Sequence, residues 1–289
     1  FNSFVGFYRF AAAEAASETF RSQAISLVIA GGVLAAIAGP QLATWSKDWL
    51  QSGLFAGSLA TFVILQILSL GLLFGIKLPR PTQTEQKDKG RALSVIMRQP
   101  IFLVAVLGSM LGYGVMVLIM TATPLAIVAA AHPFHEAAQV IQWHVLGMFA
   151  PSFFTGMLIA RFGVLNIIRC GAGLSLGCIA LNLMHQNLLS FSIALLLLGV
   201  GWNFLFIGST TLLTQAYEPA EKAKTQAAHD FLMFGFVALA TLLSGAMFEQ
   251  LGWQAVNLAG IPMILLVLGA AYWLQPQQLQ LQQPPAPKS

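Results

Sequence analysis

Ionisable side chains are rare in the long apolar stretches of this chain, so each one found inside such a stretch is a candidate for chemistry. Arg9 and Glu14 lie in the first stretch, His144 lies in a later one, and Asp230 lies beside His229 near the start of another. A titratable side chain is costly within a bilayer, and where one is kept it commonly marks a substrate or ion pathway. We therefore take Arg9, Glu14, His144 and Asp230 as candidates for substrate binding or proton coupling.

Each of these candidates also has a purely structural interpretation. Arg9 and Glu14 are five residues apart, which does not stack them as a helical pair, and Glu14 is also suited to a membrane interface. His144 follows Glu136 by eight residues, or about 12 Å of helix. It can exchange protons near neutral pH or hydrogen-bond a neighbouring helix as a neutral ring. Asp230, in the first turn of a helix, can simply complement the helix dipole.

Neutral polar residues supply three further candidates. Trp202 and Asn203 lie halfway along one stretch, where an indole face with one donor and an amide with donors and acceptors could hold a substrate. Asn203 is equally suited to joining two helices. Thr121 lies near Pro124, which is expected to break a long helix at a gate or a binding kink. Ordinary packing is the alternative for Thr121.

The stretches that position these residues are long enough to cross a membrane. Of the 289 residues, 57% are hydrophobic and 8% are charged, whereas soluble domains carry about 25% charged residues. A span needs about 20 apolar residues, so the pattern predicts an all-α integral membrane protein with about eight complete transmembrane helices plus one partial helix. The predicted stretches are 1–16 (incomplete), 23–44, 53–76, 99–130, 136–160, 164–184, 188–216, 226–249 and 254–274.

Basic residues collect in every second gap between these stretches and in the C-terminal tail. Of the fourteen Lys and Arg residues, only Lys47 falls in the opposite set of gaps, and Arg9 lies inside a stretch. Loops rich in Lys and Arg face the cytoplasm, so the C-terminus is predicted to be cytoplasmic. The cytoplasmic set is Arg21, Lys77, Arg80, Lys87, Lys89, Arg91, Arg98, Arg161, Arg169, Lys222, Lys224 and Lys288.

The same placement argues against other classes of function. The net charge of +4 sits in short loops without an aromatic-basic patch, so no nucleic-acid partner is expected. Cys170 and Cys178 belong to one predicted helix and form no disulfide framework or metal-spaced cluster. No cofactor and no metal are therefore expected. A polytopic membrane enzyme and a non-transporting scaffold remain the alternatives to a transporter, but an enzyme would need a convergent catalytic cluster, and the sequence suggests none.

The longest connection, 77–98, divides the chain into three helices and six helices. Transporters built from two six-helix halves place their longest internal loop between the halves. We therefore expect 1–76 to hold helices four to six of a first half and 99–274 to form a second half. The end of the connection, 91–98, could form a short interfacial helix, and the Gln- and Pro-rich tail 275–289 is expected to be disordered.

Two motifs carry a resemblance to the major facilitator superfamily. The run from Gly31 to Gly39-Pro40 resembles the fifth-helix antiporter motif of that family, although Ala35 and Ser26 replace two of its glycines. Small residues let helices approach closely, and proline permits a kink. The resemblance implies a structural or gating role for Gly39 and Pro40, and a plain packing face is the alternative.

The second motif, from Gly156 through Arg161 to Gly163, resembles the second-half copy of the family's loop signature, with Ala160 in place of the acidic residue. In the family this loop contacts neighbouring helix ends and helps to gate the inner side. Gly156, Arg161 and Gly163 are therefore gating candidates. Arg161 could bond the carbonyls at a helix C-terminus, or it could act only as a topological signal.

The resemblance covers essentially the whole chain and implies a bacterial member that lacks the first three helices and part of the fourth. It implies a monomeric inner-membrane transporter that moves a small organic solute (a drug, vitamin or metabolite) by alternating access, coupled to protons. In the family, an arginine in the helix that contains Arg9 often serves substrate or proton coupling.

Overall fold

The computed structural model describes residues 2–46, 49–50, 56–74 and 90–282. The predictions for Lys47, for most of the 77–98 connection and for the last seven residues fall outside these ranges. Every regular element within them is helical. The elements are α1 (Asn2–Ala15), α2 (Arg21–Ser46), α3 (Ala56–Phe74), α5 (Leu93–Met97), α6 (Pro100–Ala129), α7 (Phe134–Phe149), α8 (Ser152–Phe162), α9 (Val164–Met184), α10 (Leu188–Leu213), the 3₁₀ turn η1 (Pro219–Glu221) and α11 (Lys222–Gln282).

Five helices in the described part of the chain are long and apolar enough to cross a membrane, and there are six if the bent pair α7–α8 is one span. This agrees with the predicted all-α class. The predicted total of eight complete helices and one partial helix stays a prediction, because α1 and α3 are short and α11 runs through two predicted stretches.

Helix breaks occur beside Pro151 and at Gly252, whereas α6 continues unbroken through Pro124, so the expected break at that proline is wrong. The predicted helix 136–160 is two helices, α7 and α8, bent by 42° next to Pro151, which lacks an N–H group. Within α11, Gly252 has φ +80°, a conformation that favours glycine, and it separates the predicted stretches 226–249 and 254–274. The composition predicts a disordered tail from residue 275, but α11 continues to Gln282. The helix can extend this far because Gln and Leu support helix propagation.

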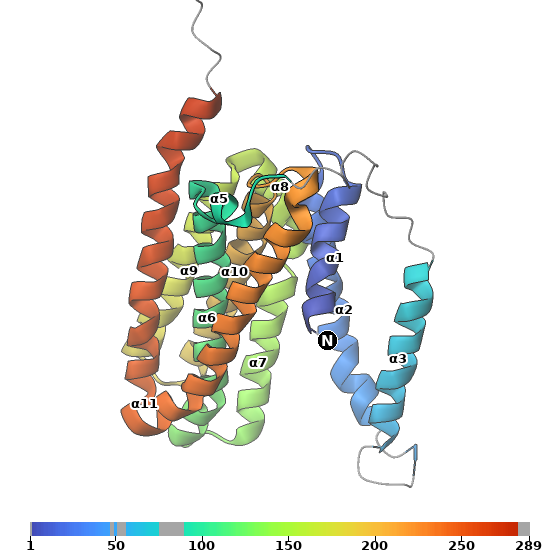
Figure 1. The fold of residues 1–289 in the computed structure, drawn as a ribbon. Coiled ribbons are helices and arrows are strands. Elements are labelled where there is room, and N and C mark those ends of the chain that lie inside the picture. Colours follow the sequence, from blue (N-terminus) through green and yellow to red (C-terminus); the bar gives the residue numbers. More distant parts are fainter. Residues whose placement is uncertain (1, 47–48, 51–55, 75–89, 283–289) are drawn as a thin grey trace, which may run out of the picture.

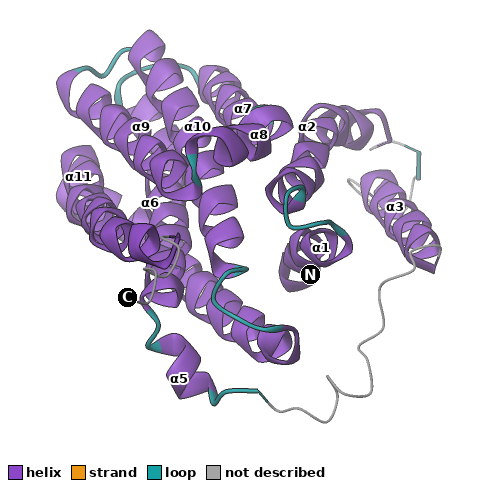
Figure 2. Ribbon diagram, turned by 90° about the horizontal axis from the view of Figure 1, so that it is seen from above, coloured by secondary structure: helices purple, strands orange, loops and turns teal. Residues whose placement is uncertain are grey.

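The helices form two groups, the first group α1–α3 and the second group α6–α11. Figure 1 shows the first group in blue and cyan beside the rest of the bundle, and Figure 2 shows the same separation from above. Helix α2 packs against α7, α8 and α10, while α3 packs against α2. Contacts between the groups therefore run mainly through α2, and α1 lies next to it.

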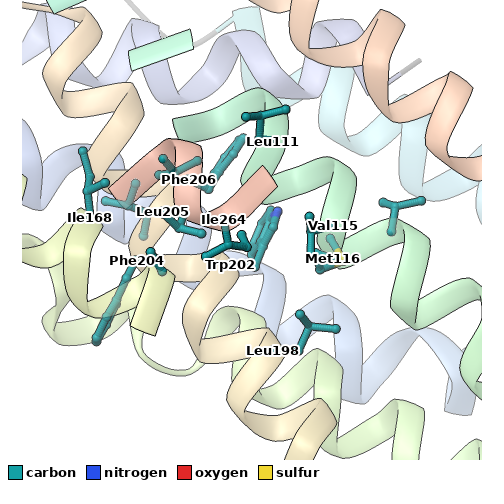
Figure 3. Close-up of a cluster of buried hydrophobic side chains, with 14 of the residues drawn as sticks. Leu111, Val115, Met116, Ile168, Leu198, Trp202, Phe204, Leu205, Phe206 and Ile264 are labelled. Carbon is teal, nitrogen blue, oxygen red and sulfur yellow. The ribbon is translucent and has the colours of Figure 1, made fainter. Parts of the chain in front are cut away.

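The core of the second group lies around α6 and α10. Every residue of α10 from Gly201 to Leu213 is buried. Figure 3 shows Trp202 and Phe206 of α10 in one apolar cluster with Leu111 and Val115 of α6. Helices that are apolar all round belong in the interior of a bundle, which fits the position of α6 and α10.

One end of the bundle, which we call the basic end, collects most of the described basic residues. At this end α2 and α11 begin, α8 ends and α5 lies across the bundle, at the top of Figure 1. The basic residues at these helix ends are Arg21, Arg91, Arg98, Arg161, Lys222 and Lys224.

Candidate functional site

A buried ion pair joins α1 to α11. The Arg9 guanidinium donates from Nη2 to Asp230 Oδ1 at 2.5 Å, and the two side chains are 2% and 13% exposed. The Arg9 Cζ atom also lies 4.6 Å from the Phe10 ring centre and 4.5 Å from that of Phe206, within the range of a cation–π interaction. Two residues that the sequence indicated separately, 221 positions apart, thus form one unit.

The ion pair continues into α6 through a histidine. His229 Nδ1 lies 2.9 Å from Asp230 Oδ1, and its Nε2 lies 2.7 Å from Ser109 Oγ. A neutral histidine with its proton on Nδ1 donates to the carboxylate and can accept a hydrogen bond from the serine hydroxyl. We call these four residues, Ser109, His229, Asp230 and Arg9, the Arg9 network. It connects three helices through hydrogen bonds between polar and charged side chains.

An aromatic cluster adjoins the Arg9 network. Its members are Tyr113 of α6, Phe149 of α7, Trp202 and Phe206 of α10, and Phe234 of α11. The Trp202 and Phe206 rings stack with centres 4.8 Å apart, and Tyr113 meets Trp202 edge-on at 5.3 Å. Because Phe206 also contacts Arg9, the aromatic cluster and the Arg9 network pack directly against each other.

Two buried donors in this region have no acceptor. Trp202 Nε1 and Arg9 Nε are enclosed, and neither has a hydrogen-bond partner among the described residues. A buried donor left unsatisfied costs about 1–3 kcal/mol. These two N–H groups are therefore available to an acceptor that the packed arrangement does not supply.

Two other candidates lie at the contact of α7 and α8 with α10. His144 is fully buried, and its Nδ1 lies 2.8 Å from the Leu195 carbonyl oxygen. Asn203 donates to the Met148 carbonyl at 2.6 Å and to Ser152 Oγ at 2.5 Å, while its Oδ1 accepts from Thr155 at 2.6 Å. The Asn203 amide is fully used across the bend between α7 and α8, which favours helix joining for this residue.

At the basic end, Glu14 contacts the other helix group. Its carboxylate accepts a hydrogen bond from Lys222 Nζ at 2.8 Å. Nearby, Arg91 donates to Glu221 from its backbone N–H and from its guanidinium at 2.5–2.7 Å. The hydrogen bonds to Glu221 raise the pKa of Arg91 above its usual value. These pairs hold α1 and the end of the long connection against the start of α11.

The second motif brings α8 against α2. A Cβ atom on Gly156 would lie 2.5 Å from the Gln23 Cα atom, so only glycine fits this contact. Ser22 Oγ donates to the Gly156 carbonyl at 3.0 Å, and the Gly156 N–H donates to Ser26 Oγ at 3.1 Å. Gly156 therefore has a close-approach role between the two helix groups.

The remaining motif residues lie apart from the Arg9 network. Gly163 ends α8 with φ +85°, a conformation that favours glycine. Arg161 is exposed and lies over the Phe162 ring at 5.2 Å. Gly39 is exposed in α2, with nothing within 4 Å of the place where a Cβ would lie, and Pro40 follows it in the same helix.

Thr121 is half-buried in α6, eight residues beyond Tyr113, which is about 12 Å of helix. The structure therefore does not bring it to the Arg9 network.

Sequence reasoning missed Ser109, Tyr113 and Phe206 as parts of the site. Nothing in the sequence separates these residues from the many other small and aromatic residues of α6 and α10. His229 stands out in the sequence only as the neighbour of Asp230. Within the described ranges, no group of three or more His, Cys, Asp and Glu residues could hold a metal ion.

Comparison with known proteins places these features in context. Residues 106–289 match the model of the Major Facilitator Superfamily. The riboflavin transporter RfnT of Brucella anthropi is 42% identical over 268 residues, which cover 92% of this chain and 67% of that protein. An uncharacterized MFS-type transporter of Bacillus subtilis, YddS, is 30% identical over 284 residues, with 92% of this chain and 65% of that protein covered.

A third relative, the drug efflux pump JefA of Mycobacterium tuberculosis, is 31% identical over 147 residues. These residues cover 49% of this chain and 28% of that protein. The chain thus spans about two thirds of the length of RfnT and YddS.

Proposed function

The chain belongs to the major facilitator superfamily, and on this premise we propose that it serves as a secondary transporter that moves a small organic solute by alternating access. Membership confirms the family resemblance seen in the sequence. It also confirms the prediction of a transporter-family protein in preference to an enzyme, and it makes the chain a multi-pass membrane protein.

The observation that carries the proposal is the buried Arg9–Asp230 pair between the first and second helix groups. A charge pair this deeply buried is not needed for stability, because burying two charges costs about as much as their attraction returns. Ionisable groups kept in spans commonly serve transport. The pair lies where two groups of helices would have to move relative to each other.

We infer that proton coupling works through competition for Asp230. In the arrangement seen here, Asp230 accepts from Arg9 and lies against His229. A proton on the carboxylate would remove its charge and weaken its hold on Arg9, and this would favour separation of α1 from α11. Coupling then follows from the differential stability of the joined and separated states.

The proposed substrate is a planar aromatic solute of the flavin type. Support comes from the 42% identity to a protein named as a riboflavin transporter and from the aromatic cluster beside Arg9, since aromatic rings offer stacking surfaces. Export of aromatic drugs is the second candidate, favoured by the similarity to a drug efflux pump.

We propose the topology that the charge pattern predicts. The protein would lie in a bacterial inner membrane as a monomer, with the basic end and the C-terminus in the cytoplasm. The parts 1–76 and 99–274 would belong to two halves of the transporter, with eight complete spans and one partial span in this chain. The break at Gly252, which separates two predicted stretches, supports the count in the second part.

Flux measured in liposomes tests the proposal. The protein, expressed from its complete open reading frame, is reconstituted with labelled riboflavin outside and a pH gradient of either sign. Accumulation of unaltered riboflavin that collapses with a protonophore supports it. A chemically altered product, or no gradient-dependent flux of riboflavin or of a panel of aromatic drugs, contradicts it.

A further inference from the structure

Two of the buried polar atoms that lack a partner among the described residues lie at the aromatic cluster, and both can only donate. Trp202 is 4% exposed and Arg9 is 1% exposed, yet Trp202 Nε1 and Arg9 Nε have no acceptor among the described residues. Both residues contact the same ring: the Trp202 indole stacks on Phe206, and the Arg9 guanidinium lies 4.5 Å from its centre. The two unused donors therefore lie on residues of α1 and α10 that both contact Phe206.

Another buried indole shows what is ordinary in this molecule. Trp253 is similarly enclosed, and its Nε1 donates to the Asn182 carbonyl at 3.2 Å. A buried tryptophan usually finds such a partner, and buried donors without one are rare in folded proteins. A phenylalanine at position 202 would supply the same stacking without the unused donor. The N–H group of Trp202, unlike that of Trp253, makes no hydrogen bond in the packed arrangement.

We propose that Trp202 Nε1 and Arg9 Nε form a recognition subsite for the carbonyl-bearing edge of a planar heteroaromatic substrate, whose ring stacks within the aromatic cluster. This inference rests on the proposed transport function and names the chemistry that the site reads. The Arg9 charge is already paired with Asp230, so a neutral carbonyl acceptor suffices. Because both nitrogens are enclosed here, the substrate enters when the cluster parts during the transport cycle.

Trp202 and Arg9 are expected to act together. Stacking stabilises the binding of many kinds of planar ring. A buried N–H group, in contrast, disfavours the binding of a ring without an acceptor, because the donor then stays unpaired. The aromatic cluster therefore supplies affinity, and the two N–H groups supply discrimination between carbonyl-bearing and plain aromatic rings.

The test compares two ligands on matched variants of the full-length protein. Riboflavin carries ring carbonyls, while anthracene is a planar tricycle without any hydrogen-bond acceptor. Trp202→Phe keeps an aromatic ring and removes the N–H group, and Trp143→Phe is the control, since Trp143 is exposed on α7. Equilibrium dialysis in detergent should show about tenfold weaker riboflavin binding in Trp202→Phe. Anthracene binding should be unchanged in both variants.

A second variant approaches the subsite from the other donor. Arg9→Lys keeps a positive charge for Asp230 but lacks Nε, so it should show the same selective loss of riboflavin with anthracene binding retained. Melting temperatures measured in parallel identify any variant that fails to fold. If either Trp202→Phe or Arg9→Lys does not fold, the ligand binding of the remaining variant tests the proposal.

Three results would overturn the inference. If Trp202→Phe weakens the binding of both ligands equally, the Trp202 ring contributes only packing. If riboflavin binding is unchanged in this variant, the Trp202 N–H group does not contact the ligand. If the unaltered protein does not bind riboflavin, the proposed class of ligand, a planar ring with carbonyl groups, is wrong. A protein that still drives flux of another solute would sustain the transport proposal while this inference fails.

Discussion

At the scale of single residues, Arg9 and Asp230 form a site because each is the other's main charge partner in the described part of the chain. Removing one partner from a buried pair leaves an uncompensated charge, whereas removing both can be nearly neutral. The two substitutions are therefore expected to be strongly non-additive.

Arg9→Gln and Asp230→Asn should each lower the free energy of unfolding by about 3–5 kcal/mol, while the double variant should lose far less than their sum. Denaturant unfolding in detergent micelles measures this cycle. Glu249→Gln is the control, because Glu249 is exposed on α11, and it should stay within about 0.5 kcal/mol of the parent. Additive losses in the double variant would mean that the two side chains act independently.

The residues of this pair are visible in the sequence, but their contact is not. Arg9 and Asp230 stand out because charges are rare in apolar stretches, yet no local pattern relates positions on α1 and α11. Asn203 shows the reverse case. Its amide is suited by type to a substrate, and only the structure shows that Met148, Ser152 and Thr155 occupy it.

At the scale of helices, the contact of α2 with α8 depends on glycine. The Gly156 backbone lies against Ser22 and Gln23, with no room for a Cβ atom. Small residues that permit close approach are a main source of helix association in membranes. The loop motif thus positions the first helix group against the second.

Gly156→Ala should lower the melting temperature in detergent and cost about 1–3 kcal/mol, because the added methyl group must separate two backbones. Gly173→Ala is the matched control: Gly173 lies in α9 with nothing within 4 Å of the place of a Cβ. There alanine should be neutral or stabilise by up to about 1 kcal/mol. Equal effects at both positions would contradict a close-approach role for Gly156.

Helix positions are predicted well from apolar length, and helix breaks are predicted less well. The expected stretch 164–184 coincides with α9, and 99–130 differs from α6 by one residue at each end. The bend at Pro151 and the helical continuation to Gln282 depart from the expectation. Hydropathy locates residues that prefer lipid, but a bend depends on single backbone groups and on neighbouring helices.

At the scale of the whole molecule, two ion pairs among the described residues join the helix groups at different depths. Arg9–Asp230 lies inside the bundle, and Glu14–Lys222 lies at the basic end, where its side chains are 27% and 32% exposed. An exposed pair contributes up to about 1 kcal/mol, which suits a contact that must break in each cycle. We expect the Glu14–Lys222 pair to bias the basic end toward the closed arrangement.

Spin labels at Ala15→Cys and Ala223→Cys, both exposed beside this pair, report its opening after Cys170 is replaced by serine. Lys222→Glu should increase the population of long distances by about fivefold, the equivalent of about 1 kcal/mol. The exchange Glu14→Lys with Lys222→Glu should restore the short distance. Identical distance distributions in all three proteins would rule out a gating contribution from this pair.

The overall relation of the two helix groups is only partly accessible from the sequence. The alternation of basic residues and the long connection predict two groups with a shared basic end. They do not indicate that α2 carries most of the contact, because an apolar helix shows no preferred face when lipid and protein neighbours are equally apolar.

Proton coupling, as proposed, depends on Asp230 because a proton and Arg9 compete for its carboxylate. The variant Asp230→Asn in liposomes separates proton coupling from substrate movement. Two rates are measured: the exchange of labelled for unlabelled riboflavin, and the net uptake of riboflavin driven by a pH gradient. We expect exchange to persist, since a neutral residue still allows the helix groups to move, and gradient-driven uptake to be lost. Full gradient-driven uptake by Asp230→Asn would show that protons are coupled elsewhere and would contradict the proposed role of this pair.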